Sequence, residues 1–236
     1  MVWDMNAIII SIGSELTFGQ TVDTNSPWLS LRLAEVGERV IAHVTVSDEM
    51  DPIRREIARA CELADVVLIS GGLGPTEDDL TRQALATAMG VELRLRPEFL
   101  DEIRDFFTRR NRDMPESNRI QAMFPAGSEP IHNTCGTAPG IRASVGKATV
   151  FVMPGVPREM RAIFEGTIVR EIAPEVRPNG VQLRLRTFGL SESELATRIE
   201  ALEPAKAGVE IGYRASFPEI ELKILARGAD PKEAMG

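Results

Sequence analysis

The sequence predicts an α/β protein in which a three-layer αβα domain with a mostly parallel sheet is followed by a small α+β module. Short apolar runs typical of strands buried on both faces alternate with amphipathic stretches of about 10–15 residues, a pattern that favours a doubly wound sheet. A cluster of proline, asparagine and glycine over residues 174–180 indicates a linker. We therefore expect the domain to cover residues 5–173 and the module residues 181–236, cut short within a helix that begins near residue 230.

Each predicted element has a local reason in the sequence. Strands are placed on continuous or alternating apolar runs, and helices begin at a capping residue or a proline. Asn25 or Ser26 caps the first helix ahead of Pro27, and Ser191 with Glu194 forms a capping box for the last one. In chain order we predict strands at 7–12, 40–46, 66–69, 91–95, 149–153, 181–188, 209–215 and 220–226, and helices at 27–36, 51–64, from the glycine loop to about 89, 97–107, 157–172 and after 191.

Composition excludes several classes of protein. With 43% hydrophobic and 26% charged residues, the 236-residue chain is too apolar for a disordered protein, and no apolar run approaches the roughly 20 residues of a membrane span. The net charge of −8 disfavours sequence-independent binding to nucleic acid. The chain begins without the basic residues of a signal peptide, and its two cysteines cannot build a disulfide framework. We expect a soluble, cytoplasmic protein with no membrane association.

The most informative segment is Ser70–Thr81, which follows a predicted buried strand. Its three glycines allow a tight turn whose backbone N–H groups, together with the start of the next helix, attract a phosphate. The adjacent Glu77, Asp78 and Asp79 would repel a phosphate unless a metal ion lay between them, so the loop suits a nucleotide bound through Mg²⁺. A plain strand-to-helix turn with acidic capping residues gives the same pattern and stays open at this point.

Other glycine-rich or acidic segments follow the remaining strands. They are Gly13–Glu15 and the stretch 19–25 after the first strand, Ser47-Asp48 after the second, Gly136–Gly140, and Met153–Pro157 after a later one. Each alone is more often a turn than a site. The carboxyl ends of parallel strands, however, share one edge of the sheet, where ligands bind in such folds. The convergence of these segments predicts a site at that edge.

Several familiar motifs are excluded by spacing. Gly13 and Gly19 are one residue too far apart for a P-loop, and Gln20 stands where that loop requires lysine. Neither a G-x-G-x-x-G dinucleotide motif nor a G-x-S-x-G nucleophile motif occurs. We expect structural roles for His43, His132 and Cys61, and we find no base that would activate Cys135.

Six segments together resemble the amino-terminal half of the competence/damage-inducible protein A (CinA) family and, more broadly, the molybdopterin-binding fold of the MogA and MoaB type. They are Ile12–Gln20, Asp23–Asn25, Ser70–Thr81, Asn118–Gln121, Gly136–Gly140 and Met153–Arg158. Matching blocks run from residue 7 to about 195 in the family's order, so the resemblance is specific.

The resemblance implies a nucleotide pyrophosphatase that acts on ADP-ribose with a divalent metal, Mg²⁺ or a similar ion such as Co²⁺, and with K⁺ as a stimulant. It also implies that the module after the linker is KH-like. That module carries Phe188–Ser193 in place of a G-x-x-G loop, and the nine basic and ten acidic residues after position 174 nearly balance. We therefore expect it to be structural or to form a homodimer, and not to bind RNA. Full-length relatives add a nicotinamide-mononucleotide amidase domain, which has no counterpart here and is not implied.

The resemblance also implies roles for particular residues. In the superfamily, an aspartate after the second strand and another after the glycine loop are catalytic. These positions match Asp48 and Asp79, with Asp78 as an alternative to Asp79, and the three are the expected metal ligands. The expected substrate-binding residues are Gly13, Glu15, Asn25, Gly71, Gly72, Gly74, Thr76, Gly136, Thr137, Pro154, Gly155 and Arg158.

We expect metal-assisted hydrolysis of a dinucleotide-like pyrophosphate, with the amides of Gly71–Gly74 holding one phosphate and a water activated by the metal attacking. Two other functions stay open. A protein that binds or adenylylates molybdopterin would use the same phosphate cradle. A non-catalytic nucleotide-binding protein associated with competence is the third interpretation, and the acidic residues of the loop argue against it.

Overall fold

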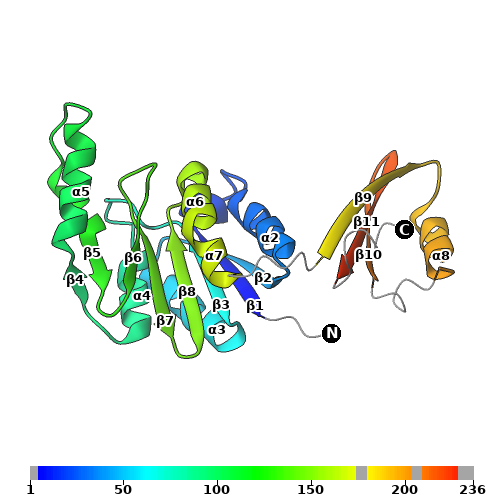
Figure 1. The fold of residues 1–236 in the computed structure, drawn as a ribbon, viewed down its shortest axis with the longest axis horizontal. Helices are drawn as coiled ribbons and strands as arrows, with labels where there is room; N and C mark the ends of the chain where they lie inside the picture. Colours follow the sequence, from blue (N-terminus) through cyan, green and yellow to red (C-terminus); the bar gives the residue numbers. More distant parts are fainter. Residues whose placement is uncertain (1–4, 174–179, 203–208, 228–236) are drawn as a thin grey trace. The chain divides into compact units, whose positions relative to one another are not determined.

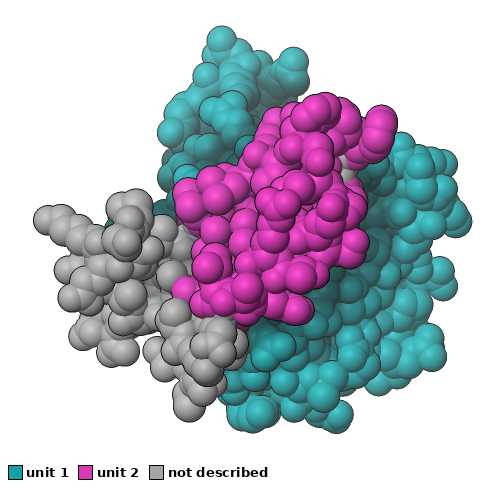
Figure 2. Space-filling view, turned by 90° about the vertical axis from the view of Figure 1, so that its right-hand side faces the viewer, with its two compact units in different colours: residues 1–31, 38–174 teal, residues 32–37, 175–236 magenta. Residues whose placement is uncertain are grey.

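The structure is a computed structural model, and the residues it describes are 5–173, 180–202 and 209–227. The chain divides into two compact units, one of residues 1–31 and 38–174 and the other of residues 32–37 and 175–236 (Figure 2). Residues 174–179 of the predicted linker and the helix predicted near residue 230 lie outside the described residues, and Gly180 begins a strand. The expected domain limits therefore stay a prediction.

A six-stranded sheet forms the centre of the first unit (Figure 1). Its strands run in the order β2-β1-β3-β8-β7-β6, and the first four are parallel to one another. Strand β7 is antiparallel to both of its neighbours, β8 and β6. The strands are β1 (Asn6–Ile12), β2 (Arg39–Val46), β3 (Val66–Ser70), β6 (Glu129–Ile131), β7 (Gly140–Val145) and β8 (Ala148–Met153).

Helices cover both faces of this sheet, which confirms the predicted three-layer αβα domain with a mostly parallel sheet. Helices α3 (Met50–Leu63) and α4 (Thr81–Met89) pack in a single apolar core with alternate residues of the strands, such as Ile8 and Ile10. On the opposite face, α2 (Asn25–Glu35) contributes the buried Leu29 and Leu33. The remaining cover there is α6 (Pro157–Ile163), a π-helical segment (Phe164–Ile168) and α7 (Val169–Ile172).

The segment between α4 and β7 differs most from the prediction. The strand predicted at 91–95 is shorter, β4 (Leu93–Leu95), and it pairs with β5 (Met123–Pro125) in a separate two-stranded sheet outside the main one. Helix α5 (Pro97–Thr108) follows β4 as predicted, and a 3₁₀ helix (Glu116–Ala122) leads into β5. The sequence did not reveal this 3₁₀ helix or strands β5, β6 and β7.

Two helix starts differ from the prediction. Helix α2 begins at Asn25, and its cap is Asp23, whose carboxylate accepts hydrogen bonds from the backbone N–H groups of Asn25 (2.9 Å) and Ser26 (3.0 Å). Burial opposes ionisation of Asp23, but hydrogen bonds from Ser26, Ser11 and Asn25 outweigh it and hold its pKa below the ordinary value. Helix α4 begins only at Thr81, so Glu77–Asp79 lie in the turn before it and not in its first turn.

The second unit is a three-stranded antiparallel sheet with one helix, which agrees with the predicted α+β module. Its strands lie in the order β10-β11-β9, and helix α8 begins with the predicted capping box of Ser191 and Glu194. Among the helices of the described residues, none is long and apolar enough to cross a membrane. The elements are β9 (Gly180–Phe188), α8 (Glu192–Glu200), β10 (Val209–Ser216) and β11 (Glu219–Arg227).

Candidate active site

The carboxyl ends of β1, β2, β3 and β8 surround a cavity of about 460 Å³, which we call the carboxylate cavity. Most of the residues singled out in the sequence line it, namely Gly13, Glu15, Asp48, Gly71, Gly72, Gly74, Thr76, Asp78, Asp79, Thr137, Pro154 and Gly155. The segments that follow separate strands therefore meet at one edge of the sheet, as the parallel topology requires.

The glycine loop leaves β3 through a turn that only glycine adopts without strain. Gly71 and Gly72 have φ angles of +115° and +65°. A side chain at Gly71 would press on the carbonyl oxygen of Ile12, and one at Gly72 would press on the hydroxyl of Thr81. The Gly71 N–H donates to the carbonyl oxygen of Met153 (3.0 Å), which ties the loop to the end of β8.

The carboxylate of Asp79 closes this loop from inside. It accepts hydrogen bonds from the backbone N–H groups of Gly74 (2.7 Å) and Thr76 (2.9 Å). The expectation that all the loop amides are free for a phosphate is therefore wrong for Gly71 and Gly74. Within the described residues, the hydrogen bonds account for those two amides but not for the amides of Gly72 and Leu73.

Arg82 holds the loop through its backbone carbonyl groups, and no sequence pattern pointed to this role. Its side chain is fully buried, and its guanidinium donates to the carbonyl oxygens of Leu73 (2.6 Å) and Gly74 (3.3 Å). Burial lowers the pKa of Arg82 to about 10, although the nearby Asp79 carboxylate acts in the opposite direction. At neutral pH a buried positive charge thus lies beneath the glycine loop.

Asp78 differs from Asp79 in its surroundings. Asp78 is exposed, whereas Asp79 is half-buried against the loop. The hydroxyl of Thr76 is within hydrogen-bond distance of both carboxylates, which places the two side by side. The bond from Thr76 holds the pKa of Asp78 below its ordinary value.

Asp48 enters the cavity from the end of β2. Its carboxylate accepts a hydrogen bond from the N–H of Ser14 (2.6 Å), and its own N–H donates to the Ser14 hydroxyl (3.2 Å). Ser14 begins the short helix α1 (Ser14–Thr17). Strand β1 lies between β2 and β3, so Asp48 and Asp79 follow strands that are not neighbours, although both line the same cavity.

Two further polar residues of the lining were not among the expected site residues. Glu159, in the first turn of α6, accepts a hydrogen bond from the side-chain amide of Asn133 (2.6 Å). Gln121 accepts from Asn118 (2.8 Å) and lies with its amide nitrogen 3.4 Å from the Leu73 carbonyl oxygen. Gln121 belongs to a segment that carried the family resemblance, so a signal for it existed, whereas Glu159 looked like an ordinary acidic residue at a helix start.

Three expected substrate-binding residues lie outside the carboxylate cavity. Asn25 lines a smaller cavity of about 130 Å³ and donates to the Ser70 hydroxyl and to the Gly155 carbonyl oxygen, both at 2.8 Å. Gly136 lines a different cavity beside α5. Arg158 is exposed and does not belong to the lining. The substrate-binding roles of these three residues stay predictions.

The carboxylates fit a metal ion only if other ligands join them. Among the described residues, no three or more His, Cys, Asp or Glu side chains are grouped closely enough to hold a metal ion. In nucleotide sites, Mg²⁺ commonly takes one or two carboxylates and completes its shell with phosphate oxygens and water. The adjacent carboxylates of Asp78 and Asp79 meet that smaller requirement.

Comparison with protein families matches the two units separately. Residues 8–174 match a family described as a probable molybdopterin binding domain, and residues 182–236 match the damage-inducible protein CinA KH domain.

Individual relatives match nearly the whole chain. A CinA-like protein of Citrifermentans bemidjiense is 38% identical over 96% of this chain and 55% of its own length. A protein of Shewanella oneidensis named nicotinamide-nucleotide amidohydrolase PncC is 40% identical over 95% of this chain and 53% of its own length. The chain thus spans about half the length of the curated relatives it matches.

Among solved structures, the protein CinA of Thermoplasma acidophilum, described as of unknown function, is similar with a TM-score of 0.64. Its sequence is 35% identical, and the match covers 69% of this chain and 95% of that one. This likeness extends the sequence match to the three-dimensional fold.

Proposed function

This chain belongs to the CinA family, and its residues 8–174 belong to the family of probable molybdopterin binding domains. We propose that its first unit is a metal-dependent nucleotide pyrophosphatase. The proposed substrate is ADP-ribose or a related molecule with two nucleoside-like halves joined by a pyrophosphate. The observation that carries the proposal is the carboxylate cavity, in which a glycine turn lies beside several acidic side chains.

The charges of the cavity support a metal-dependent reaction. Its described lining contains five carboxylates and no lysine, arginine or histidine. A pyrophosphate carries negative charge and would be repelled by these groups unless a cation compensated them. The buried Arg82 supplies one positive charge, but Asp79 lies beside it and the guanidinium is outside the lining.

The residues of the loop divide into positioning and binding roles. We assign the amides of Gly72 and Leu73 to the binding of one phosphate group, since the other loop amides are already bonded within the protein. Asp78 and Asp79 would hold the divalent ion, and Asp48, which lines the same cavity, would complete the metal site directly or through a bound water. A carboxylate has about four acceptor positions, so Asp79 can bond the loop and still bind an ion. Such an ion, when bound, neutralises developing charge and lowers the pKa of the attacking water.

A second candidate function is binding or adenylylation of molybdopterin, favoured by the description of the family that residues 8–174 match. It would use the same glycine loop to hold a phosphate group. The difference lies in the acceptor, which would be molybdopterin and not water. The amidohydrolase activity named for the Shewanella relative belongs to a protein of which this chain matches 53%, and we do not propose it for this unit.

Release of AMP from ADP-ribose, measured by chromatography with Mg²⁺ and again after EDTA treatment, tests the proposal. We expect one AMP and one ribose 5-phosphate for each water consumed, and loss of turnover in EDTA. Undiminished turnover in EDTA would contradict the role of the metal. Absence of AMP release, together with thermal stabilisation by molybdopterin and none by ADP-ribose, would favour the second candidate.

A further inference from the structure

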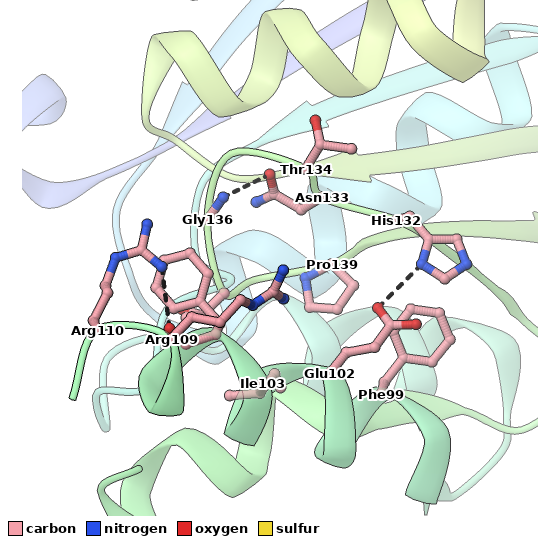
Figure 3. Close-up of a pocket in the computed structure, with 12 residues that line it drawn as sticks. Phe99, Glu102, Ile103, Arg109, Arg110, His132, Asn133, Thr134, Gly136 and Pro139 are labelled. Atoms are coloured by element: carbon pink, nitrogen blue, oxygen red, sulfur yellow. Dashed lines mark hydrogen bonds and ion pairs between the residues drawn. The ribbon is translucent and has the colours of Figure 1, made fainter. Parts of the chain in front are cut away.

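A second cavity of the first unit lies between helix α5 and the loop that follows β6 (Figure 3). We call it the α5 cavity, and its volume is about 450 Å³. The helix side is formed by Phe99, Glu102, Ile103 and Phe106 with Arg109 and Arg110, and the loop side by His132, Asn133, Thr134, Gly136, Thr137 and Pro139.

Flat side chains make up much of the wall. The guanidinium of Arg110 lies over the ring of Phe106, with its carbon 3.5 Å from the ring centroid. On the other side, the His132 ring stacks on Phe99, with centroids 4.9 Å apart and planes inclined by 30°. The side chain of Arg109 extends from the helix toward Pro139 (Figure 3). Aromatic rings and guanidinium planes are the groups on which nucleobases stack.

The positive charge of the two arginines is partly offset within the helix. Arg109 donates to the carbonyl oxygen of Asp105 (3.2 Å), and Arg110 donates to that of Phe106 (3.1 Å). These carbonyls belong to the last turn of α5, where the helix dipole is negative. Glu102 adds a carboxylate to the same wall. The α5 cavity therefore suits a neutral aromatic ring with hydrogen-bond acceptors at its edge better than a bare phosphate.

The α5 cavity adjoins the carboxylate cavity. Thr137 lines both of them. Asn133, in the wall of the α5 cavity, donates a hydrogen bond of 2.6 Å to Glu159, in the wall of the carboxylate cavity. One elongated molecule can therefore place a phosphate group in the carboxylate cavity and a ring in the α5 cavity.

We propose that the α5 cavity binds the nucleobase of the nucleotide whose phosphates occupy the carboxylate cavity. This inference rests on the proposed function for the position of the phosphates, and it identifies the substrate class as a nucleotide recognised at its base. The side chain of Arg109 and the Arg110 guanidinium that lies on the Phe106 ring supply the stacking surfaces, and the free N–H groups of the arginines meet the acceptors of the base edge.

Calorimetric titration of the full chain in Mg²⁺ with adenosine, AMP and ribose 5-phosphate tests the proposal. AMP and ribose 5-phosphate share the phosphate and the ribose, so their difference in affinity reports on the base. We expect AMP to bind more tightly than ribose 5-phosphate, and adenosine to bind measurably. Phe106→Ala and Arg109→Ala should each weaken AMP and adenosine about 10-fold and leave ribose 5-phosphate unchanged. Arg104→Ala is the matched control, because Arg104 lies on the same helix, pairs with Asp101 at 3.0 Å and is outside the cavity.

Three results would overturn the inference. These are equal affinity of the unchanged protein for AMP and ribose 5-phosphate, an equal loss of both ligands in Arg109→Ala, which identifies an anion site, and unaltered AMP affinity in both cavity variants. Hydrolysis of ADP-ribose is measured in parallel. A chain that prefers AMP but does not cleave ADP-ribose contradicts the proposed function alone, and one that cleaves ADP-ribose without preferring AMP contradicts this inference alone.

Discussion

The two cavities of the first unit are built in different ways. The carboxylate cavity lies at the ends of buried strands and rests on interior groups: Arg82 is fully buried and Leu73 is 1% exposed. The α5 cavity rests on the core residues Phe99 and Ile103, but other parts of its wall are surface side chains, with Glu102 and His132 exposed by 51% and 68%. The first cavity is therefore part of the fold, whereas the exposed side chains of the second can change without altering the fold.

One substrate requires two tasks, chemistry at its phosphate and recognition of its ring, and the two cavities divide these tasks between them. Chemistry at a phosphate needs charges held in place, which buried hydrogen bonds to the backbone provide. Recognition of a ring needs a stacking surface, which exposed side chains supply at little cost to stability. Substitutions in the carboxylate cavity should therefore lower turnover and stability, while those in the α5 cavity should change affinity alone.

We expect the largest effect, a fall in turnover, from Asp79→Asn, which tests the carboxylate cavity. The asparagine has one acceptor oxygen for the amides of Gly74 and Thr76, which both bond the carboxylate in the unchanged protein, and it removes one charge from the proposed metal site. We expect kcat for ADP-ribose hydrolysis to fall roughly 10²–10⁴-fold, the range for loss of one catalytic charge or proton-transfer group. Steady-state kinetics at saturating Mg²⁺ measure this effect.

Asp78→Asn and Asp48→Asn, measured in the same assay, show which of the three carboxylates turnover requires. Asp78 is exposed and does not bond the amides of Gly74 and Thr76 that Asp79 holds, so its replacement should leave the loop intact and report the metal site alone. A loss of turnover in Asp78→Asn with full activity in Asp79→Asn would transfer the catalytic role to Asp78. Full activity in all three variants would leave the pyrophosphatase without its proposed carboxylates.

The next effect concerns stability and comes from Arg82→Met. Methionine fills a similar volume but removes the guanidinium donors to the carbonyl oxygens of Leu73 and Gly74 and the positive charge near Asp79. Removing one partner of a buried charge pair costs about 3–5 kcal/mol, so we expect the free energy of unfolding to fall by about 3 kcal/mol. Trp28 belongs to the first unit, so denaturation followed by tryptophan fluorescence measures this change. Unaltered stability would show that the loop does not depend on its buried support.

Much of the fold could be predicted because its central strands are continuous apolar runs. Strands β1, β3 and β8 fall where the sequence placed them, since burial on both faces demands apolar residues at every position. Strand β6 was missed because it has three residues, one of them Pro130. The pairing of β4 with β5 outside the main sheet could not be predicted, because alternation indicates a strand but not its partner.

The site was predictable to the extent that topology determines it. Segments that follow parallel strands must meet at one edge, so Asp48 and Asp79 could be expected in the same cavity. Arg82 could not be expected beneath it, because arginine is usually exposed and nothing in the sequence indicates its burial. The α5 cavity was also beyond reach, since it depends on how a helix packs against a loop more than twenty residues further along the chain.

The smallest effect is expected from Glu102→Gln, and it tests the other side of the comparison. Glu102 lies 3.1 Å from the ring nitrogen of His132, but more than half of each side chain is exposed, and the pair carries two charges only when the histidine is protonated. Exposed ion pairs contribute about 0–1 kcal/mol, and the stacking of His132 on Phe99 does not require the carboxylate. We expect the free energy of unfolding, measured by the same fluorescence, to change by less than about 0.5 kcal/mol. A loss as large as that of Arg82→Met would make the wall of the α5 cavity part of the structural core, and the contrast between the two cavities would then fail.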